Sequence, residues 1–292
     1  MSDYLKSSLA VGLLRLLGIL PLSWVYGLSK LTLLLMLRFP TQSLKQTRLN
    51  VQRCWPNLTR QQQTTLVGES MLHTIYAALE MGINWTQPSQ SGLDRIIKVS
   101  GADCLKQAHL MGGVILLTPH LGNWELFANW AAHEAKVTAL YKPAKLHGLD
   151  RLIHGARTKA GMQLAPASAK GVMQLKRALL KGEVNLILPD QEPPPKAGII
   201  SQWFNQPAYT MTLVSQLAKT KNTRVLMGFA RRVPSRLGFI IELEDITEVC
   251  RQTTIETSVK AINQAIEELV RRAPEQYQWE YRRFKHTLEQ EH

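Results

Sequence analysis

The chain has few cysteines and few acidic residues for its size. Its 292 residues include 3 cysteines, and no two of them form a C-x-x-C pair. Such widely spaced thiols argue against a disulfide framework or a structural zinc site, and they are typical of a reducing compartment. The 22 Asp and Glu are outnumbered by 35 Lys and Arg, which gives a net charge of +13. This excess predicts an anionic partner, and composition alone leaves open nucleic acid, an anionic membrane surface, or an acidic substrate or carrier.

Several catalytic motifs are missing as well. The sequence contains no G-x-S-x-G, no G-x-G-x-x-G, no Walker A and no H-E-x-x-H. These absences argue against a serine hydrolase, a dinucleotide or ATP site and a zinc protease. The histidines show no metal-ligand spacing, so we predict no metal and no cofactor. Basic residues are spread along the chain without a reader motif, which disfavours a nucleic-acid partner.

No apolar run is long enough for a clean transmembrane helix, even in the apolar amino-terminal region. Arg15 interrupts the first run, Pro21 follows it, and Lys30 interrupts the second. A spanning helix needs roughly 20 apolar residues. Two short helices that anchor the protein in the membrane interface fit residues 1–39 better, because their basic side chains can reach lipid phosphates. The alternative is a helical hairpin packed on the protein's own core.

The rest of the chain, residues 40–292, is expected to form one larger domain. Residues 40–92 are predicted to be helical, with a capping box at Thr59 for a helix that ends near Met81. Residues 93–292 alternate short apolar runs with helical segments, which predicts an α/β core. Its sheet is expected to be mainly parallel or mixed and covered by helices on both faces. The predicted strands are residues 97–100, 114–117, 137–141, 163–165, 184–188, 225–230 and 238–243, and a helix is predicted at 209–219.

A histidine follows directly after the most apolar of these strands. The run at 114–117 is typical of a buried parallel strand, and His120 stands where open α/β sheets bind ligands. On a continuous helix Glu125 would point about 140° away from His120, so the pair requires the turn that Gly122 and Asn123 allow. One interpretation is a general base, His120, oriented by Glu125. The other is a surface histidine beside a glutamate that favours the helix dipole.

Polar residues also follow two further predicted strands. Lys142 comes after one of them, and Asp190 with Gln191 after the other. Together with the histidine they are expected to form a rim above the sheet. Arg157, on the next helix, supplies a positive charge for a phosphate or an oxyanion, or is a solvated helix charge. Without a nucleophile motif, such a site favours direct proton abstraction from a substrate hydroxyl.

The spacing H-x-x-x-x-E from His120 to Glu125 resembles the acyltransferase motif of the lipid A biosynthesis (late) acyltransferases. The resemblance covers almost the whole chain, because further segments match that family in order and spacing. These segments are Arg48-Leu-Asn50, Cys54-Trp-Pro56, Tyr141-Lys142-Pro143, Arg157 with Gly161, Leu188-Pro-Asp190-Gln191, Trp203 to Thr210, and Pro274 to Lys285. Asn205 replaces a glycine usual in the family, which predicts a left-handed Asn there, and Trp55 and Trp203 replace common phenylalanines.

The resemblance implies an enzyme at the cytoplasmic face of the inner membrane. Such an enzyme moves a fatty acyl chain from acyl carrier protein to a hydroxyl of a phosphorylated glucosamine lipid. The acidic carrier, the anionic glycolipid acceptor and the membrane lipid surface would each account for part of the positive charge. Two alternatives stay open: an acceptor that is another glycolipid or an amino-acid lipid, and a catalytically silent membrane-binding relative.

The resemblance also implies roles for individual residues. His120 would deprotonate the acceptor hydroxyl, and Glu125 would hold the imidazole and stabilise the imidazolium. Asn123 or nearby backbone N–H groups would stabilise the oxyanion. Lys142 and Arg157 would bind phosphate. The remaining pair, Asp190 and Gln191, would shape the rim.

Overall fold

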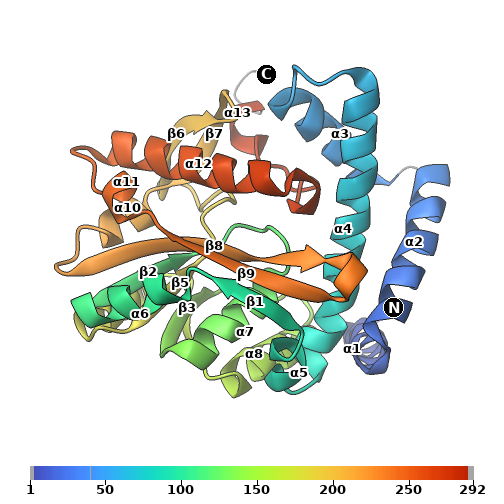
Figure 1. Cartoon of the computed structure of the whole chain (residues 1–292), viewed down its shortest axis with the longest axis horizontal. Helices are drawn as coiled ribbons and strands as arrows, with labels where there is room; N and C mark the ends of the chain where they lie inside the picture. The colour runs from blue at the N-terminus through green and yellow to red at the C-terminus, as the bar shows by residue number, and fades with distance from the viewer. Residues whose placement is uncertain (1–2, 40, 289–292) are drawn as a thin grey trace.

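A seven-stranded sheet forms the centre of the molecule (Figure 1). The computed structural model describes residues 3–39 and 41–288, so residues 1–2, 40 and 289–292 of the two predicted segments lie outside the described part. Neighbouring strands in the order β1-β9-β8-β2-β5-β3-β4 are parallel except for β8 and β9. The predicted α/β class with a mixed, mainly parallel sheet is confirmed. The strands are β1 (Ile96–Ser100), β2 (Gly113–Leu117), β3 (Val137–Tyr141), β4 (Gln163–Pro166), β5 (Val184–Ile187), β8 (Thr223–Val233) and β9 (Gly238–Asp245).

Strand β2 shows why the sheet is buried on both sides. Successive side chains of a strand point to opposite faces, and here both sets are apolar. Val114 and Leu116 belong to one core cluster, and Ile115 and Leu117 to the other, and all four side chains are 0% exposed. Helices α6 and α7 complete the first cluster, while α9 and α12 complete the second (Figure 1). The helices of this part are α5 (Ser89–Leu93), α6 (Ala102–Met111), α7 (Trp124–Glu134), α8 (His147–Lys159), α9 (Ala169–Leu180), α10 (Leu213–Leu217), α11 (Thr247–Cys250), α12 (Ile255–Arg272) and α13 (Lys285–Leu288).

The long helix α4 (Arg60–Thr86) follows the shorter α3 (Gln42–Cys54) and connects the amino-terminal helices to the sheet. The predicted capping box is present: the Thr59 hydroxyl accepts from the Gln62 backbone N–H, and the Gln62 side chain accepts from that of Thr59. The helix continues beyond its predicted end because its last turns still pack on the core, where Met81 and Ile83 are buried.

Helices α1 (Asp3–Ile19) and α2 (Leu22–Arg38) pack against α4 with one face and expose the other (Figure 1). A Cβ built on Gly18 would lie 2.7 Å from the Gly82 carbonyl oxygen of α4, so the first of these packings requires glycine. Largely exposed apolar side chains of the two helices are Leu9, Leu13, Leu16, Ile19, Trp24, Leu28, Leu31, Leu34 and Leu35. The amino-terminal helices therefore join the protein's own core and still present an apolar outer surface.

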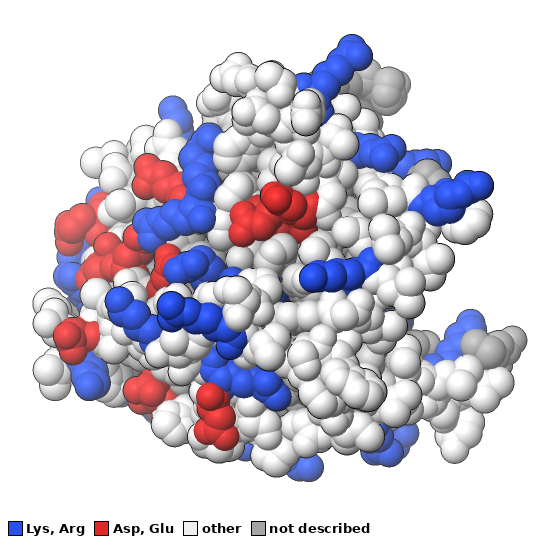
Figure 2. Space-filling model, turned by 45° about the vertical axis from the view of Figure 1, so that its right-hand side comes forward, with Lys and Arg blue, Asp and Glu red and all other residues white. Residues whose placement is uncertain are grey.

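This outer surface is also poor in acidic residues. The right-hand side of Figure 2, which carries these helices, shows uncharged surface with isolated basic side chains. Within residues 3–39 and 41–288, no single helix has the length and apolar character to cross a bilayer. The bent pair of α2 and α3 passes that test when its two helices are taken together, on length and composition.

A two-stranded hairpin, β6 (Gly198–Trp203) and β7 (Gln206–Met211), lies outside the main sheet. Its turn residues Phe204 and Asn205 have φ values of 46° and 59°, so the predicted left-handed Asn is confirmed. The predicted helix at 209–219 is wrong in its first part, because Tyr209–Met211 belongs to β7 and only Leu213–Leu217 is helical. Pairing with β6 overrides the helical pattern of this segment.

Candidate active site

His120 and Asp190 meet at the carboxyl ends of two neighbouring parallel strands. His120 follows β2 and Asp190 follows β5, and β2 pairs with β5. The Asp190 carboxylate accepts two hydrogen bonds of 2.9 Å from the same residue, one from His120 Nδ1 and one from the His120 backbone N–H. The side chain of Asp190 is 1% exposed and that of His120 15%. The carboxylate thus fixes the imidazole in place, and only part of the ring reaches solvent.

The environment of Asp190 keeps this carboxylate ionised. Burial alone would raise its pKa, but the adjacent His120 and the hydrogen bonds from it lower the pKa below the ordinary value. Tyr277 lies on the other side of the carboxylate, and burial together with Asp190 raises the pKa of its phenol well above the ordinary value. The phenol therefore stays protonated beside the charged carboxylate.

The other ring nitrogen of His120 faces the second rim residue. With Nδ1–H donated to the carboxylate, Nε2 carries the lone pair, and the Gln191 amide nitrogen lies 3.2 Å from it. Trp124 packs beside the imidazole, with ring centroids 5.2 Å apart. The tautomer set by Asp190 is thus the one a general base requires, with its lone pair on the side away from the carboxylate.

Glu125 lies elsewhere than predicted, and its partner is a cation. Its carboxylate, 2% exposed, pairs with Arg157 of α8 and accepts a 3.0 Å hydrogen bond from the Trp85 indole. The orienting contact expected of Glu125 is therefore made by Asp190 instead. The physical reason is that Glu125 stands in the first turn of α7, which directs its side chain toward α4 and α8. A role of Glu125 in catalysis stays a prediction.

Arg157, which the sequence suggested as a group that binds phosphate, already has a counter-ion in Glu125. Burial opposes its charge, but Glu125 raises the pKa of the guanidinium above the ordinary value. Its side chain is 24% exposed and lies over the Tyr141 ring, 5.7 Å from the centroid. Arg157 is thus first of all the charge partner of Glu125 and part of the wall of the site.

Asn123 caps helix α7, and its buried side chain is held by hydrogen bonds to the protein. Its side-chain oxygen accepts from the Leu126 backbone N–H and from Asn84, and its amide donates to Glu80. The backbone N–H of Asn123 donates to the Ala230 carbonyl. These contacts fix the side chain, which is 2% exposed, and they use one of its two amide hydrogens. The oxyanion role of Asn123 stays a prediction.

The turn between the two motif residues depends on glycine. Gly122 has φ of +62°, and a Cβ there would come within 2.1 Å of the Ala230 carbonyl oxygen. A buried ion pair supports this turn: Arg232 donates to Glu80 through two 2.7 Å bonds and to the Gly122 carbonyl through a bond of 3.2 Å. Sequence reasoning missed both charged residues. The available signals were an acidic residue on the apolar face of α4 and an arginine at an inward position of β8.

A cavity of about 770 Å³ opens beside His120, Gln191 and Glu125. Its inner walls are mostly apolar and come from both core layers and the segment after β7; they include Ala128, Ala139, Leu140, Met162, Val172, Leu186, Ile187, Leu188, Met211 and Leu213. Lys142 is exposed and lies on the same cavity. The structure therefore brings three of the predicted rim residues, His120, Lys142 and Gln191, to one opening of an apolar space, while Asp190 is buried behind His120. Within the described part of the chain, no group of three or more His, Cys, Asp or Glu side chains is placed to hold a metal ion.

This arrangement defines an α/β protein whose histidine, backed by a carboxylate, faces an apolar cavity at the carboxyl edge of a mainly parallel sheet. Residues 1–286 match the family described as bacterial lipid A biosynthesis acyltransferase. The chain belongs to this family and is an acyltransferase of lipid A biosynthesis.

Individual relatives match over most of their length. The chain is 26% identical to the lipid A biosynthesis lauroyltransferase of Escherichia coli K12, over 97% of this chain and 92% of the relative. A lipid A biosynthesis acyltransferase of Haemophilus influenzae is 25% identical over 80% of this chain and 73% of its own. The lipid A biosynthesis palmitoleoyltransferase of E. coli K12 is 26% identical over 82% and 77%. Two of these relatives are named for different acyl groups, lauroyl and palmitoleoyl.

Proposed function

We propose that this protein transfers a fatty acyl chain from acyl carrier protein to a hydroxyl of a phosphorylated glucosamine lipid, with His120 as the general base. The observation that carries the proposal is the His120–Asp190 pair at the mouth of an apolar cavity. A fixed base with its lone pair toward the cavity activates a hydroxyl, and the apolar walls provide space for an acyl chain.

The proposed reaction needs no covalent acyl-enzyme. The acceptor hydroxyl takes the place of the Gln191 amide at Nε2 of His120 and gives up its proton as its oxygen attacks the thioester carbonyl. The new C–O bond forms, the C–S bond breaks, and the proton passes from His120 to the departing thiolate. Asp190 stabilises the transient imidazolium. This route is supported by the partners of the ring, Asp190 and Gln191, neither of which is a serine or cysteine nucleophile.

Two buried cysteines of one core cluster support the same conclusion. Burial raises the pKa of Cys54 and of Cys250 to about 12, so both thiols stay protonated at neutral pH. A protonated, buried thiol is a poor nucleophile. Direct transfer between the two bound substrates therefore fits the site better than a cysteine-linked intermediate.

In this proposal the two charged walls of the opening have separate roles. Glu125 acts through Arg157 and Trp85, which it holds against the site. Lys142, exposed at the opening and without a carboxylate partner among the described residues, is the cation offered to the phosphate of the donor or the acceptor.

We further propose that the protein works at the cytoplasmic face of the inner membrane. The apolar outer surface of α1 and α2 supports this, because its exposed leucines and Trp24 have no cover within the described chain. A direct test replaces Leu9 and Leu16, which are 57% and 54% exposed, with glutamine. The matched control changes Leu110 and Leu180 of the α/β core, which are 87% and 64% exposed, in the same way. We expect the first variant alone to lose sedimentation with vesicles; equal sedimentation of both would contradict the proposed anchor.

The reaction is tested with purified full-length protein in neutral mixed micelles, acyl carrier protein charged with a labelled fatty acid, and several acceptors. We expect label on the phosphorylated glucosamine lipid. Transfer only to another glycolipid or to an amino-acid lipid would replace the proposed acceptor. Absence of transfer to every acceptor, with intact binding to vesicles, would favour a catalytically silent relative.

A further inference from the structure

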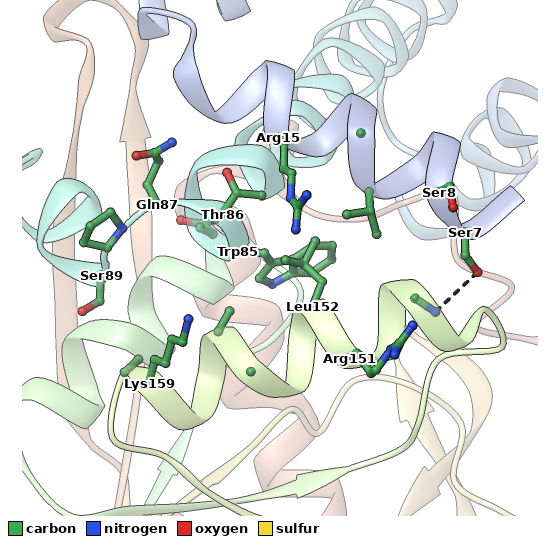
Figure 3. Close-up of a pocket in the computed structure, with 18 of the residues that line it drawn as sticks. Ser7, Ser8, Arg15, Trp85, Thr86, Gln87, Ser89, Arg151, Leu152 and Lys159 are labelled. Carbon is green, nitrogen blue, oxygen red and sulfur yellow. Dashed lines mark hydrogen bonds between the residues drawn. The ribbon is translucent and has the colours of Figure 1, made fainter. Parts of the chain in front are cut away.

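A second cavity, of about 880 Å³, lies between α1, the end of α4 and α8 (Figure 3). Three basic side chains line it: Arg15 from α1, and Arg151 and Lys159 from α8. Figure 3 shows Arg15 reaching down from α1 into the space above α8. No Asp or Glu belongs to its lining. This volume lies within the range of about 300–1,000 Å³ that is usual for small-molecule sites.

The three cations have no counter-charge within the described part of the chain. Among the described residues, none of Arg15, Arg151 and Lys159 forms an ion pair or a side-chain hydrogen bond. Other arginines near the sheet are paired, as Arg157 is with Glu125 and Arg224 with Asp245. All three side chains are exposed to solvent, so they are free to bind an anion that enters the cavity.

Two glycines line this cavity and leave room for larger side chains. Gly12 of α1 and Gly155 of α8 line it, and a Cβ built on either would meet nothing within 4 Å. Glycine inside a helix is less favourable than alanine, and close packing often explains its presence, as at Gly18 beside Gly82. At Gly12 and Gly155 no neighbour demands it. Larger side chains at these two positions can therefore be used to fill the space between the two helices.

The cavity adjoins both the apolar surface and the active site. Arg15 and Gly12 lie on α1, whose outer leucines are exposed. Trp85 forms part of the cavity wall, and its indole N–H donates to Glu125 on the catalytic side. A lipid lying along α1 would thus bring its head group to the three cations, one side chain away from the catalytic wall.

We propose that this cavity binds the phosphate group of an anionic lipid head group through Arg15, Arg151 and Lys159. Guanidinium groups match phosphate oxygens as planar, two-pronged donors, and lysine adds a point charge. A concave space of this size fits a head group better than the convex surface of an acidic protein. The phosphate has two possible sources, the acceptor lipid or a bulk anionic phospholipid. The acceptor source rests on the proposed function, and the phospholipid source does not.

The test compares four full-length proteins: wild type, the charge variant R15Q/R151Q/K159Q, the filled variant G12L/G155L, and the control K176Q/K219Q/K260Q. The control removes the same number of positive charges from exposed positions outside the cavity. The filled variant keeps every charge and closes the space. Activity is measured in neutral micelles with the phosphorylated acceptor and its dephosphorylated form. Binding is measured by sedimentation with phosphatidylcholine vesicles, with and without phosphatidic acid.

If the acceptor supplies the phosphate, the charge and filled variants raise the KM for the phosphorylated acceptor about tenfold while kcat stays within about twofold. Removal of the phosphate from the acceptor then raises the KM of the wild type but leaves the KM of the charge variant unchanged. If a bulk phospholipid supplies it, the KM values agree and the two variants lose the extra binding that phosphatidic acid gives wild type. Either result supports the site.

The proposal is overturned if the charge variant matches the control in both assays. It is equally overturned if the charge variant is impaired and the filled variant is not, since charge alone would then be sufficient without the cavity. A wild type that acylates no acceptor would count against the proposed function, and the vesicle assay would still decide whether the cavity binds phosphate.

Discussion

The cavity beside His120 and the cavity between α1 and α8 differ in whether the charged side chains around them are paired. In the first, the buried ionisable groups are paired: Asp190 holds His120, and Glu125 holds Arg157. In the second, three cations line the space and no acidic residue does. A site that moves protons needs fixed partners that set a tautomer, whereas a site that binds an anion leaves its charges open for the ligand. We therefore expect loss of the paired groups around His120 to act mainly on kcat, and loss of the three cations of the second cavity to act on KM.

The largest expected effect is that of His120→Ala, which removes the proposed general base. We expect kcat to fall by about 10²–10⁴-fold, the usual contribution of a positioned general base. The measurement is steady-state transfer of labelled acyl groups. His133→Ala changes an exposed histidine near the end of α7 and serves as the matched control. Undiminished activity of the His120 variant would show that the first cavity is not the catalytic site.

Asp190→Asn should give the next largest effect and separates the two carboxylates of the site. The amide can donate to Nδ1 and so favours the tautomer with a proton on Nε2, which is useless as a base. We expect kcat to fall about 10²-fold, with KM little changed and the fold intact by circular dichroism. If Glu125→Gln lowers kcat more than Asp190→Asn does, Glu125 is the orienting residue after all.

Glu125→Gln should act more on stability than on the base. The change leaves the Arg157 charge, 24% exposed, without its partner. Removing one member of a buried ion pair is strongly destabilising, and this partial exposure reduces the expected loss to about 2 kcal/mol of unfolding free energy. Denaturant unfolding measures it. The double variant E125Q/R157Q should recover part of the loss, and failure to do so would show that the pair is not coupled.

The smallest effect concerns salt and sharpens the contrast between the cavities. Raising ionic strength screens exposed cations more than buried pairs, with a Debye length of about 10 Å at 0.1 M. We expect the wild-type KM for the phosphorylated acceptor to rise a few-fold with salt, and kcat to change little. In R15Q/R151Q/K159Q this rise should be reduced. An equal rise in both proteins would place the salt-sensitive contact outside the second cavity.

Most of the fold was predictable because its strongest signals are local. The strands of the main sheet are short apolar runs, and burial on both faces leaves such runs few other structures. The hairpin β6–β7 was not predictable in this way, since its strands pair mainly with each other and its polar positions resemble loop or helix. The apolar amino-terminal region allowed two interpretations, and the structure shows that α1 and α2 bury one face in the core and expose the other.

The local residue pattern shows which residues stand at the carboxyl ends of strands, and therefore that His120, Lys142 and Asp190 lie along one edge of the sheet. Which of these residues touch depends on contacts between distant segments. Strand order places β5 beside β2, which brings Asp190 to His120 and puts Lys142, after β3, one strand further away. The packing of α7 against α4 and α8 then turns Glu125 toward Arg157. Residue spacing along the chain fixes neither choice, because the order of parallel strands and the direction of a helix face are set by contacts between distant segments.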